Sequence, residues 1–149
     1  MILTYGRVST EEQAADGTTS LKVQERKCRG LAMMRGAGAY DTITYTDAGV
    51  SGSIPLGDRP SGRRLLEEAN AGDTIVVAKL DRIFRSASDA LVTAEALAKR
   101  KIDLILLDMG NEPVTSNGVA KLFFTMLSAF AEFERGRIAE RMADGRKAK

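Results

Sequence analysis

The sequence contains no histidine and a single cysteine, Cys28, and these two scarcities remove most of the familiar catalytic groups. Without histidine there can be no Ser-His-Asp triad, no Cys-His pair and no usual zinc site. A single cysteine cannot form a disulfide framework, which favours a reducing, cytoplasmic location. Cys28 also lies within a helical pattern, which is typical of a buried thiol and not of a cysteine phosphatase loop. Any catalysis must therefore use Ser, Asp, Glu, Lys and Arg side chains.

Long apolar runs are missing as well. No stretch approaches the ~20 residues that a membrane span needs. Acidic side chains also occur among the first thirty residues, where a secretory leader would be apolar. The sequence thus predicts a soluble intracellular protein without a membrane partner. Its 149 residues, 44% of them hydrophobic, are enough for one compact core.

The net charge of +2 conceals an uneven distribution. The chain has 22 basic and 20 acidic residues, and residues 135–149 contain six of the basic and two of the acidic ones. The remainder of the chain is slightly acidic. A local density of basic side chains is typical of contact with a nucleic acid backbone, although a solvated helix end has the same composition.

Strand and helix patterns alternate along the chain. Strands are predicted at residues 2–6, around Ile43 and Tyr45, at 74–78 and at 102–107, with helices at about 20–34, after Asp58-Arg59-Pro60 and at about 86–101. This order predicts an α/β fold, a three-layer sandwich in which right-handed crossovers place helices on both faces of a mostly parallel sheet.

Apolar residues recur at spacings of three and four from Gly118 to near Asp144, which predicts a long C-terminal helix. Such a helix is roughly 39 Å long at ~1.5 Å per residue, more than a small domain needs for its own core. We expect part of it to project and to pack against a partner subunit. The alternative is a helix that frays after Arg135.

Arg7 and Ser9 stand at the end of the first apolar run. Because side chains alternate faces on an extended segment, Arg7 and Ser9 point the same way while Val8 points into the core. A guanidinium can bind two phosphate oxygens and offset the charge that develops when a hydroxyl attacks phosphorus. The alternative is an ordinary helix start, because Thr10 and Gln13 have the spacing of a capping box.

Polar residues also follow the later strands. After the second and third strands these are Asp47, Ser51, Arg59, Asp81, Arg82 and Arg85. Ligands of open parallel sheets bind outside the carboxyl ends of the strands, so arginines from three connections should gather around the serine hydroxyl. The sequence has no G-x-G-x-x-G after the first strand and no phosphate loop, which disfavours dinucleotide binding at this edge.

Four motifs in order carry a more specific signal. They are Tyr5-Gly6-Arg7-Val8-Ser9-Thr10 with Gln13, Asp58-Arg59-Pro60, Leu80-Asp81-Arg82 with Arg85, and Leu127-Ser128-Ala129-Phe130-Ala131-Glu132-Phe133-Glu134-Arg135. Together they resemble the catalytic domain of the serine recombinases, the resolvase/invertase family, over essentially the whole chain. The resemblance implies a five-stranded sheet, with a short last strand near residues 111–115, and a reaction that needs no metal or other cofactor.

The resemblance also implies a reaction on double-stranded DNA at a specific recombination site. Ser9 would attack a phosphodiester, form a 5′-phosphoserine bond and free a 3′-hydroxyl, so that strands are rejoined without ATP. The residues that match catalytic positions of the family are Ser9, Arg7, Arg59, Asp81, Arg82, Arg85 and Arg135. The residues that match supporting positions are Tyr5, Gln13, Gln24, Asp47 and Ser51.

In such proteins the long helix builds a homodimer and a synaptic tetramer. The interface candidates here are Val119, Leu122, Phe123, Met126 and Phe130. Residues 1–134 would form the catalytic domain, and residues 135–149 would continue the helix toward a DNA-binding domain that the chain lacks. Two alternatives stay open at this point: an assembly module that is inactive without its DNA-binding domain, and a nucleotide-binding or hydrolytic α/β enzyme.

Overall fold

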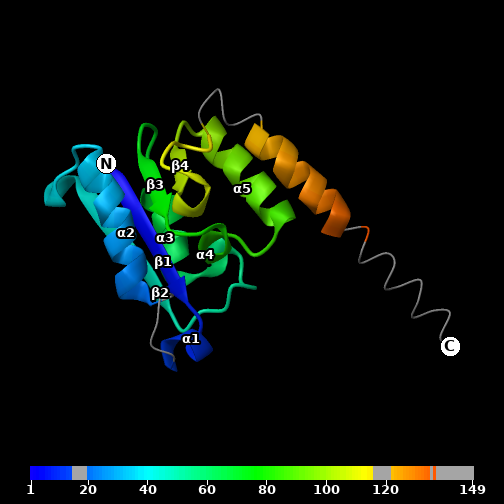
Figure 1. Cartoon of the computed structure of the whole chain (residues 1–149), viewed down its shortest axis with the longest axis horizontal. Helices are drawn as coiled ribbons and strands as arrows, with labels where there is room; N and C mark the ends of the chain where they lie inside the picture. Colours follow the sequence, from blue (N-terminus) through cyan, green and yellow to red (C-terminus); the bar gives the residue numbers. More distant parts are fainter. Residues whose placement is uncertain (15–19, 116–121, 135, 137–149) are drawn as a thin grey trace.

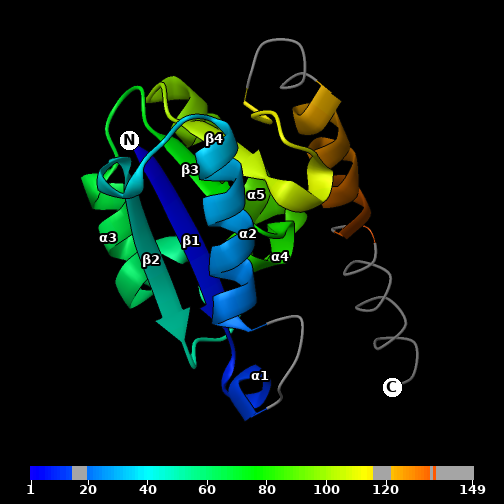
Figure 2. The same cartoon turned by 60° about the vertical axis from the view of Figure 1, so that its left-hand side comes forward.

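The computed structural model describes residues 1–14, 20–115, 122–134 and 136, which form one sheet with helices on both faces (Figures 1 and 2). The strands are β1 (Ile2–Val8), β2 (Thr42–Ala48), β3 (Thr74–Val77) and β4 (Asp103–Leu106). The α-helices are α1 (Thr10–Ala14), α2 (Leu21–Met34), α3 (Pro60–Glu68), α4 (Leu80–Ile83) and α5 (Ala87–Lys99), and a further helix covers residues 122–134. Short 3-10 helices are η1 (Ala39–Asp41), η2 (Leu56–Asp58) and η3 (Leu107–Met109).

All strands of the sheet are parallel and follow the order β2-β1-β3-β4. Tyr5 in the central strand β1 pairs with Tyr45 on one side and with Val77 on the other. The chain therefore leaves β1 toward one edge of the sheet and later returns on its other side. This reversal is the place where open α/β sheets bind their ligands. The predicted parallel α/β architecture is confirmed.

The prediction of a fifth strand near residues 111–115 is wrong, because the sheet of the described residues has four strands. The segment does approach the edge strand β4, where Val114 N donates to Leu104 O over 2.8 Å. The next bond, from Leu104 N, goes to the Thr115 hydroxyl at 3.1 Å. Leu104 N thus bonds a threonine side chain where a strand would offer a backbone carbonyl, and Pro113 lacks the N–H that a strand residue would donate.

Alternation along the strands divides the core between the two faces of the sheet. Leu3, Ile75 and Leu104 belong to a large apolar cluster that includes residues of α3, α5 and the 122–134 helix. Their neighbours in sequence, such as Val76 and Ile105, pack with the α2 residues of a smaller cluster, which are Cys28, Leu31 and Ala32. Burial raises the pKa of the Cys28 thiol to about 12, in keeping with the inert thiol predicted from its helical setting.

Serine side chains start the two longest of the labelled helices at the predicted places. Ser20 Oγ accepts from Val23 N at 3.3 Å at the start of α2, and Ser86 Oγ accepts from Asp89 N at 3.1 Å at the start of α5. Each hydroxyl satisfies one of the N–H groups that a helix leaves without an internal partner. Gly36, with a φ of 81°, follows the end of α2 in the left-handed conformation that glycine adopts most easily.

The helix over residues 122–134 lies beside α5 (Figures 1 and 2). It buries Phe123, Leu127 and Ala131 against the core. The remainder of the predicted 118–144 helix, including Val119, falls outside the described residues. None of the described helices is long and apolar enough to span a bilayer.

Candidate active site

The site is built at the carboxyl end of β1, where Ser9 begins α1. Ser9 N donates to Glu12 Oε1 at 3.0 Å, and Glu12 N donates to Ser9 Oγ at 3.2 Å. This is a reciprocal capping box. It lies one residue before the Thr10–Gln13 pair that the sequence suggested, so that prediction was wrong in its register. The half-buried Ser9 therefore caps the start of α1, and its N–H shares the Glu12 carboxylate with Arg82.

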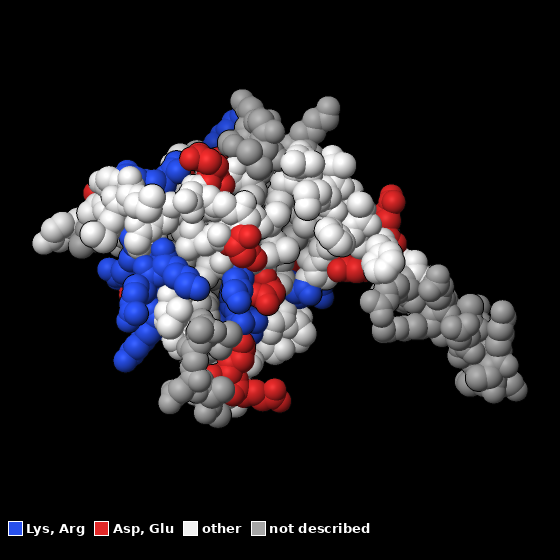
Figure 3. All heavy atoms as spheres, in the orientation of Figure 1, with Lys and Arg blue, Asp and Glu red and all other residues white. Residues whose placement is uncertain are grey.

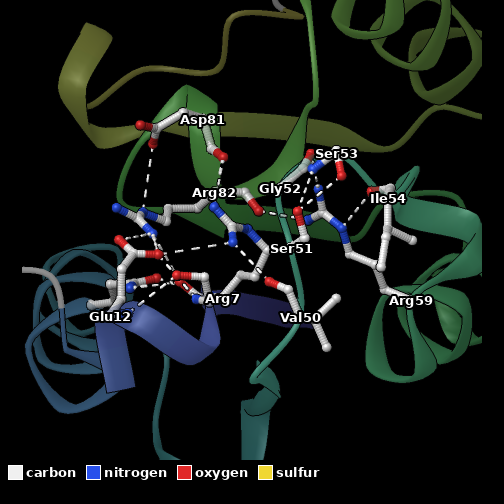
Figure 4. Close-up of polar contacts among 12 residues, drawn as sticks. Arg7, Glu12, Val50, Ser51, Gly52, Ser53, Ile54, Arg59, Asp81 and Arg82 are labelled. Carbon is white, nitrogen blue, oxygen red and sulfur yellow. Dashed lines mark hydrogen bonds and ion pairs between the residues drawn. The ribbon is translucent and has the colours of Figure 1, made fainter. Parts of the chain in front are cut away.

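Glu12 joins this helix start to two arginines. Its Oε2 lies 2.7 Å from Arg82 Nη1, and its Oε1 lies 3.9 Å from Arg7 Nη1. Figure 4 shows the carboxylate between the two guanidinium groups. The hydrogen bond from Ser9 N, followed by that from Arg82, lowers the pKa of Glu12 to about 2. Glu12 is thus an anion over the whole neutral range.

Arg7 is only 6% exposed, and its guanidinium ties three segments together. Its Nη1 donates to Val50 O at 2.8 Å, in the connection after β2, and its Nη2 donates to Asp81 O at 3.3 Å, in α4. The Nε of Arg7 is buried, and no hydrogen-bond acceptor for it occurs among the described residues. Burial, and after it the charges of Arg59 and Arg82, lower the pKa of Arg7. The site therefore concentrates positive charge in a poorly solvated place.

Arg59 is completely buried, and its N–H groups are bound to other parts of the chain. Nε donates to Ile54 O at 2.9 Å, and Nη1 donates to Arg82 O at 2.6 Å. Nη1 also donates to Tyr5 Oη at 3.2 Å, and Nη2 donates to Gly52 O at 3.4 Å. Arg59 thus fixes the loop after β2 against α4 (Figure 4). In this structure its role is to hold the backbone that carries the other arginines.

Gln24 fixes the backbone of Arg7 from α2. Arg7 N donates to Gln24 Oε1 at 3.1 Å, and Gln24 Nε2 donates to Arg7 O at 3.0 Å. This close approach depends on Gly6, because a Cβ there would stand 3.2 Å from Gln24 Oε1 and 3.3 Å from Leu21 Cδ2. One buried amide side chain therefore sets the position of the strand end from which Arg7 and Ser9 project.

Asp47 lies at the end of β2 and is buried beside the N-terminus of α3. Its carboxylate accepts from Ser61 N at 2.9 Å and from Gly62 N at 3.0 Å, and from Tyr5 Oη at 2.8 Å. A carboxylate at this position satisfies free N–H groups of the helix and complements its dipole. Burial raises the pKa of Tyr5, which keeps its hydroxyl protonated as the donor to Asp47. These two supporting residues orient α3 and Arg59.

Several predicted residues lie at the margin of this cluster or outside it. Asp81 is exposed, and its Oδ1 is 3.5 Å from Arg82 Nε, so it holds an arginine. Ser51 is exposed and shares a 2.9 Å hydrogen bond with Ser53. Arg85 lines a separate hollow of about 450 Å³ beside the 122–134 helix, together with Phe84, Leu127 and Phe130. Gln13 is exposed on α1 near Gly49, and Arg135 falls outside the described residues.

The arginines of this cluster contribute little to the charge of the molecular surface. Figure 3 shows basic side chains gathered over α2, where Lys22, Arg26, Lys27 and Arg29 are exposed. The guanidinium groups of Arg7, Arg59 and Arg82 lie below the surface, and Glu12 forms ion pairs with Arg7 and Arg82. No group of three or more metal-binding side chains occurs in the described part of the chain. The described residues thus bring the Ser9 hydroxyl, the Glu12 carboxylate and the guanidinium groups of Arg7 and Arg82 into one cluster.

Glu12 is the residue that sequence reasoning missed. The S-x-x-E spacing of Ser9 and Glu12 was available as a signal, because it is the ordinary pattern of a helix start. The attachment to Arg82, which lies seventy residues later in α4, could not be inferred from that spacing.

Comparisons with known proteins agree with this geometry. Residues 2–149 match the family described as Resolvase, N terminal domain. The chain is 37% identical over 148 residues to a putative DNA recombinase of Bacillus subtilis, covering 98% of this chain and 27% of that protein. It is 34% identical over 144 residues to the Tn2501 resolvase of Escherichia coli, covering 97% of this chain and 68% of the resolvase.

A solved structure is similar as well. The N-terminal catalytic domain of TP901-1 integrase superposes with a TM-score of 0.73 at 39% identity, covering 91% of this chain and 96% of that one. The fold and the site define the class of protein: a parallel α/β sheet with a serine and clustered arginines where the strand order reverses. The family match then identifies the family. The chain belongs to the resolvase family, as its N-terminal domain. It spans about a quarter of the Bacillus subtilis relative's length.

Proposed function

We propose that this chain is the catalytic domain of a serine recombinase, and that Ser9 is its nucleophile toward DNA. The observation that carries the proposal is the placement of Ser9 at the start of α1, with its N–H and Arg82 directed at one carboxylate. A serine at the mouth of an arginine cluster is suited to attack on a phosphodiester, because the guanidinium groups offset charge on the phosphate as it reacts.

In the proposed reaction Ser9 Oγ attacks the phosphorus of a DNA phosphodiester. The Oγ–P bond forms and the bond from phosphorus to the 3′-oxygen breaks. The serine loses its proton to a base, and the departing 3′-oxygen gains one. The 5′-phosphate stays on Ser9, so the energy of the broken ester is kept in the new ester. Attack by a 3′-hydroxyl reverses the step and rejoins a strand without ATP.

The arginines divide into two roles in this proposal. Arg82 and Arg7 contact the phosphate, since both have guanidinium nitrogens directed at the Glu12 anion in the free chain. Arg59 is a positioning residue, because its donors bind Tyr5 and backbone carbonyls of the chain itself. Arg85 and Arg135 are proposed to join the site only when DNA or a second subunit is present. Asp81 holds Arg82.

The proposed partner, besides DNA, is a second copy of this chain. The 122–134 helix is apolar on two sides. Phe123, which the sequence offered as an interface candidate, is 2% exposed and packs into the chain's own core, so the proposed interface leaves it out. A second, exposed side carries Leu122, Met126, Phe130 and Phe133, and Phe130 is 56% exposed. An apolar stripe of this kind is typical of a contact between subunits, and a two-fold pairing of the helices would cover it.

Residues 1–134 are proposed as the catalytic unit, and the basic residues 135–149 as its continuation toward DNA. The competing proposal is an assembly module without catalytic activity, and the exposed apolar face of the 122–134 helix supports both proposals equally. Formation of a covalent protein–DNA adduct would distinguish the catalytic domain from the assembly module.

The test uses short duplexes of randomised sequence with a nick, so that cleavage near the nick releases a short strand and cannot be reversed. We expect the wild-type chain to form a denaturant-resistant protein–DNA adduct. Ser9→Ala should form none, whereas Ser53→Ala, a control in the neighbouring loop, should behave as wild type. Adducts of equal yield with Ser9→Ala would refute the assignment of the nucleophile.

A further inference from the structure

The Glu12 side chain is bound as an anion ligand would be. Its carboxylate accepts from Ser9 N at 3.0 Å and from Arg82 Nη1 at 2.8 Å. A second guanidinium, that of Arg7, lies 3.9 Å away, close enough for an ion pair but too far for a hydrogen bond. These donors come from the end of β1 and from α4 and meet at one carboxylate (Figure 4).

The donors around Glu12 lie in a poorly solvated place. Arg7 and Arg82 are each 6% exposed, so little water reaches them. Arg7 Nε is a buried donor without an acceptor among the described residues, and such a donor on a charged group is costly. A phosphodiester also spreads one negative charge over two free oxygens, so it can accept from the same N–H groups that bind the Glu12 carboxylate.

We propose that the Glu12 carboxylate occupies the binding site of the scissile phosphate in the free chain, and that DNA enters the site by displacing it. This inference rests on the proposed function for the identity of the anion, and it adds an internal competitor to that function. Glu12 lies on α1, a helix of five residues, so a change in one side chain and one short helix is enough to vacate the donors.

The competitor is permanent at neutral pH, because the Glu12 pKa of about 2 keeps the carboxylate charged. A binding site that is free for only a fraction of the time shows an affinity reduced by that fraction. The free chain should therefore bind simple anions weakly, despite its arginines. The same competition would restrain attack by Ser9 on phosphates that are not held firmly by other contacts.

The experiment titrates inorganic phosphate into the ¹⁵N-labelled chain at pH 7 and follows the Ser9 amide resonance. Glu12→Gln removes the charge and retains an oxygen that can accept from Ser9 N. Glu11→Gln is the matched control, because it removes an exposed carboxylate from the same helix. We expect Glu12→Gln to bind phosphate about tenfold more tightly than wild type, as for a site otherwise free about one tenth of the time. Glu11→Gln should change the affinity less than about twofold, because the charge of the exposed Glu11 is screened by solvent and salt.

Equal affinities of the Glu12→Gln and Glu11→Gln variants would overturn the inference. Weaker binding by Glu12→Gln would also overturn it, because Glu12 would then organise the arginines for the anion. If Glu12→Gln does not fold, Glu12→Asp replaces it, since the shorter side chain withdraws the carboxylate from Arg82. Failure of the proposed function has a different signature: no variant would form a DNA adduct, while the order of phosphate affinities would remain as stated.

Discussion

Replacement of Gln24 by leucine tests how the end of β1 is held. In the wild-type chain the Gln24 amide bonds both the N–H and the carbonyl of Arg7, and both contacts are buried. Leucine has a similar volume and can make neither bond. The Arg7 N–H then loses this acceptor, while the carbonyl keeps a 3.3 Å bond from Arg82 Nη1.

The expected loss follows from these partners. A buried N–H without an acceptor costs about 1–3 kcal/mol, and a lost bond to a carbonyl that keeps a second donor costs about 1 kcal/mol. The free energy of unfolding should therefore fall by about 2–4 kcal/mol, with a decrease in Tm of about 5–15 °C for a domain of this size.

Urea unfolding followed by circular dichroism measures this loss, with Lys22→Gln as a control on the exposed side of α2. Adduct formation at Ser9 should decrease further than stability alone explains, because the Arg7 backbone precedes the proposed nucleophile by two residues. A Gln24→Leu variant that unfolds at the same urea concentration as the control would refute the reasoning.

Three other outcomes are expected from single features. The Glu12 pKa is lower in the folded chain than the ordinary value of 4.5, so the ionised Glu12 stabilises the fold above pH 4.5, and this stabilisation is lost as pH falls toward about 2. Glu12→Gln should therefore have a lower free energy of unfolding than wild type at pH 7, and the difference should disappear near pH 2, as measured by unfolding at a series of pH values. Gly62→Ala should cost about 1–3 kcal/mol in thermal unfolding, because the new methyl group would overlap the carbonyl oxygen of Leu56, whereas Gly30→Ala, on an open part of α2, should gain about 0.5–1 kcal/mol. Phe130→Glu should keep the circular dichroism spectrum of the folded chain and abolish self-association in sedimentation equilibrium, and a variant that still associates would remove this helix face from the interface.

The order of strands and helices was predictable because each element carries its own local signal. The buried β-branched run at 74–78 marks a strand covered on both faces, and the serines before α2 and α5 mark helix starts. The gathering of Arg7, Arg59 and Arg82 also followed from sequence, since residues after parallel strands meet at one edge of the sheet.

The parts that could not be predicted depend on contacts between distant segments. Whether Phe123 or Phe133 faces outward is set by the rotation of the helix against α5, which periodicity alone leaves undetermined. Pro113 and the Thr115 side chain decide that the last segment approaches β4 without forming a strand. Asp47 is a charged residue after a strand, as a site residue would be, but its carboxylate caps α3. The position of α3 relative to β2 decides this, and the sequence pattern does not show it.

The most direct test of the central claim is to identify the residue that carries DNA. The adduct formed on a nicked duplex is digested with trypsin and nuclease, and the modified peptide is sequenced by mass spectrometry. The account predicts a nucleotide joined through its 5′-phosphate to Ser9, within the peptide that runs from Val8 to Lys22. A nucleotide attached to any other residue, or joined through its 3′-phosphate, would contradict it.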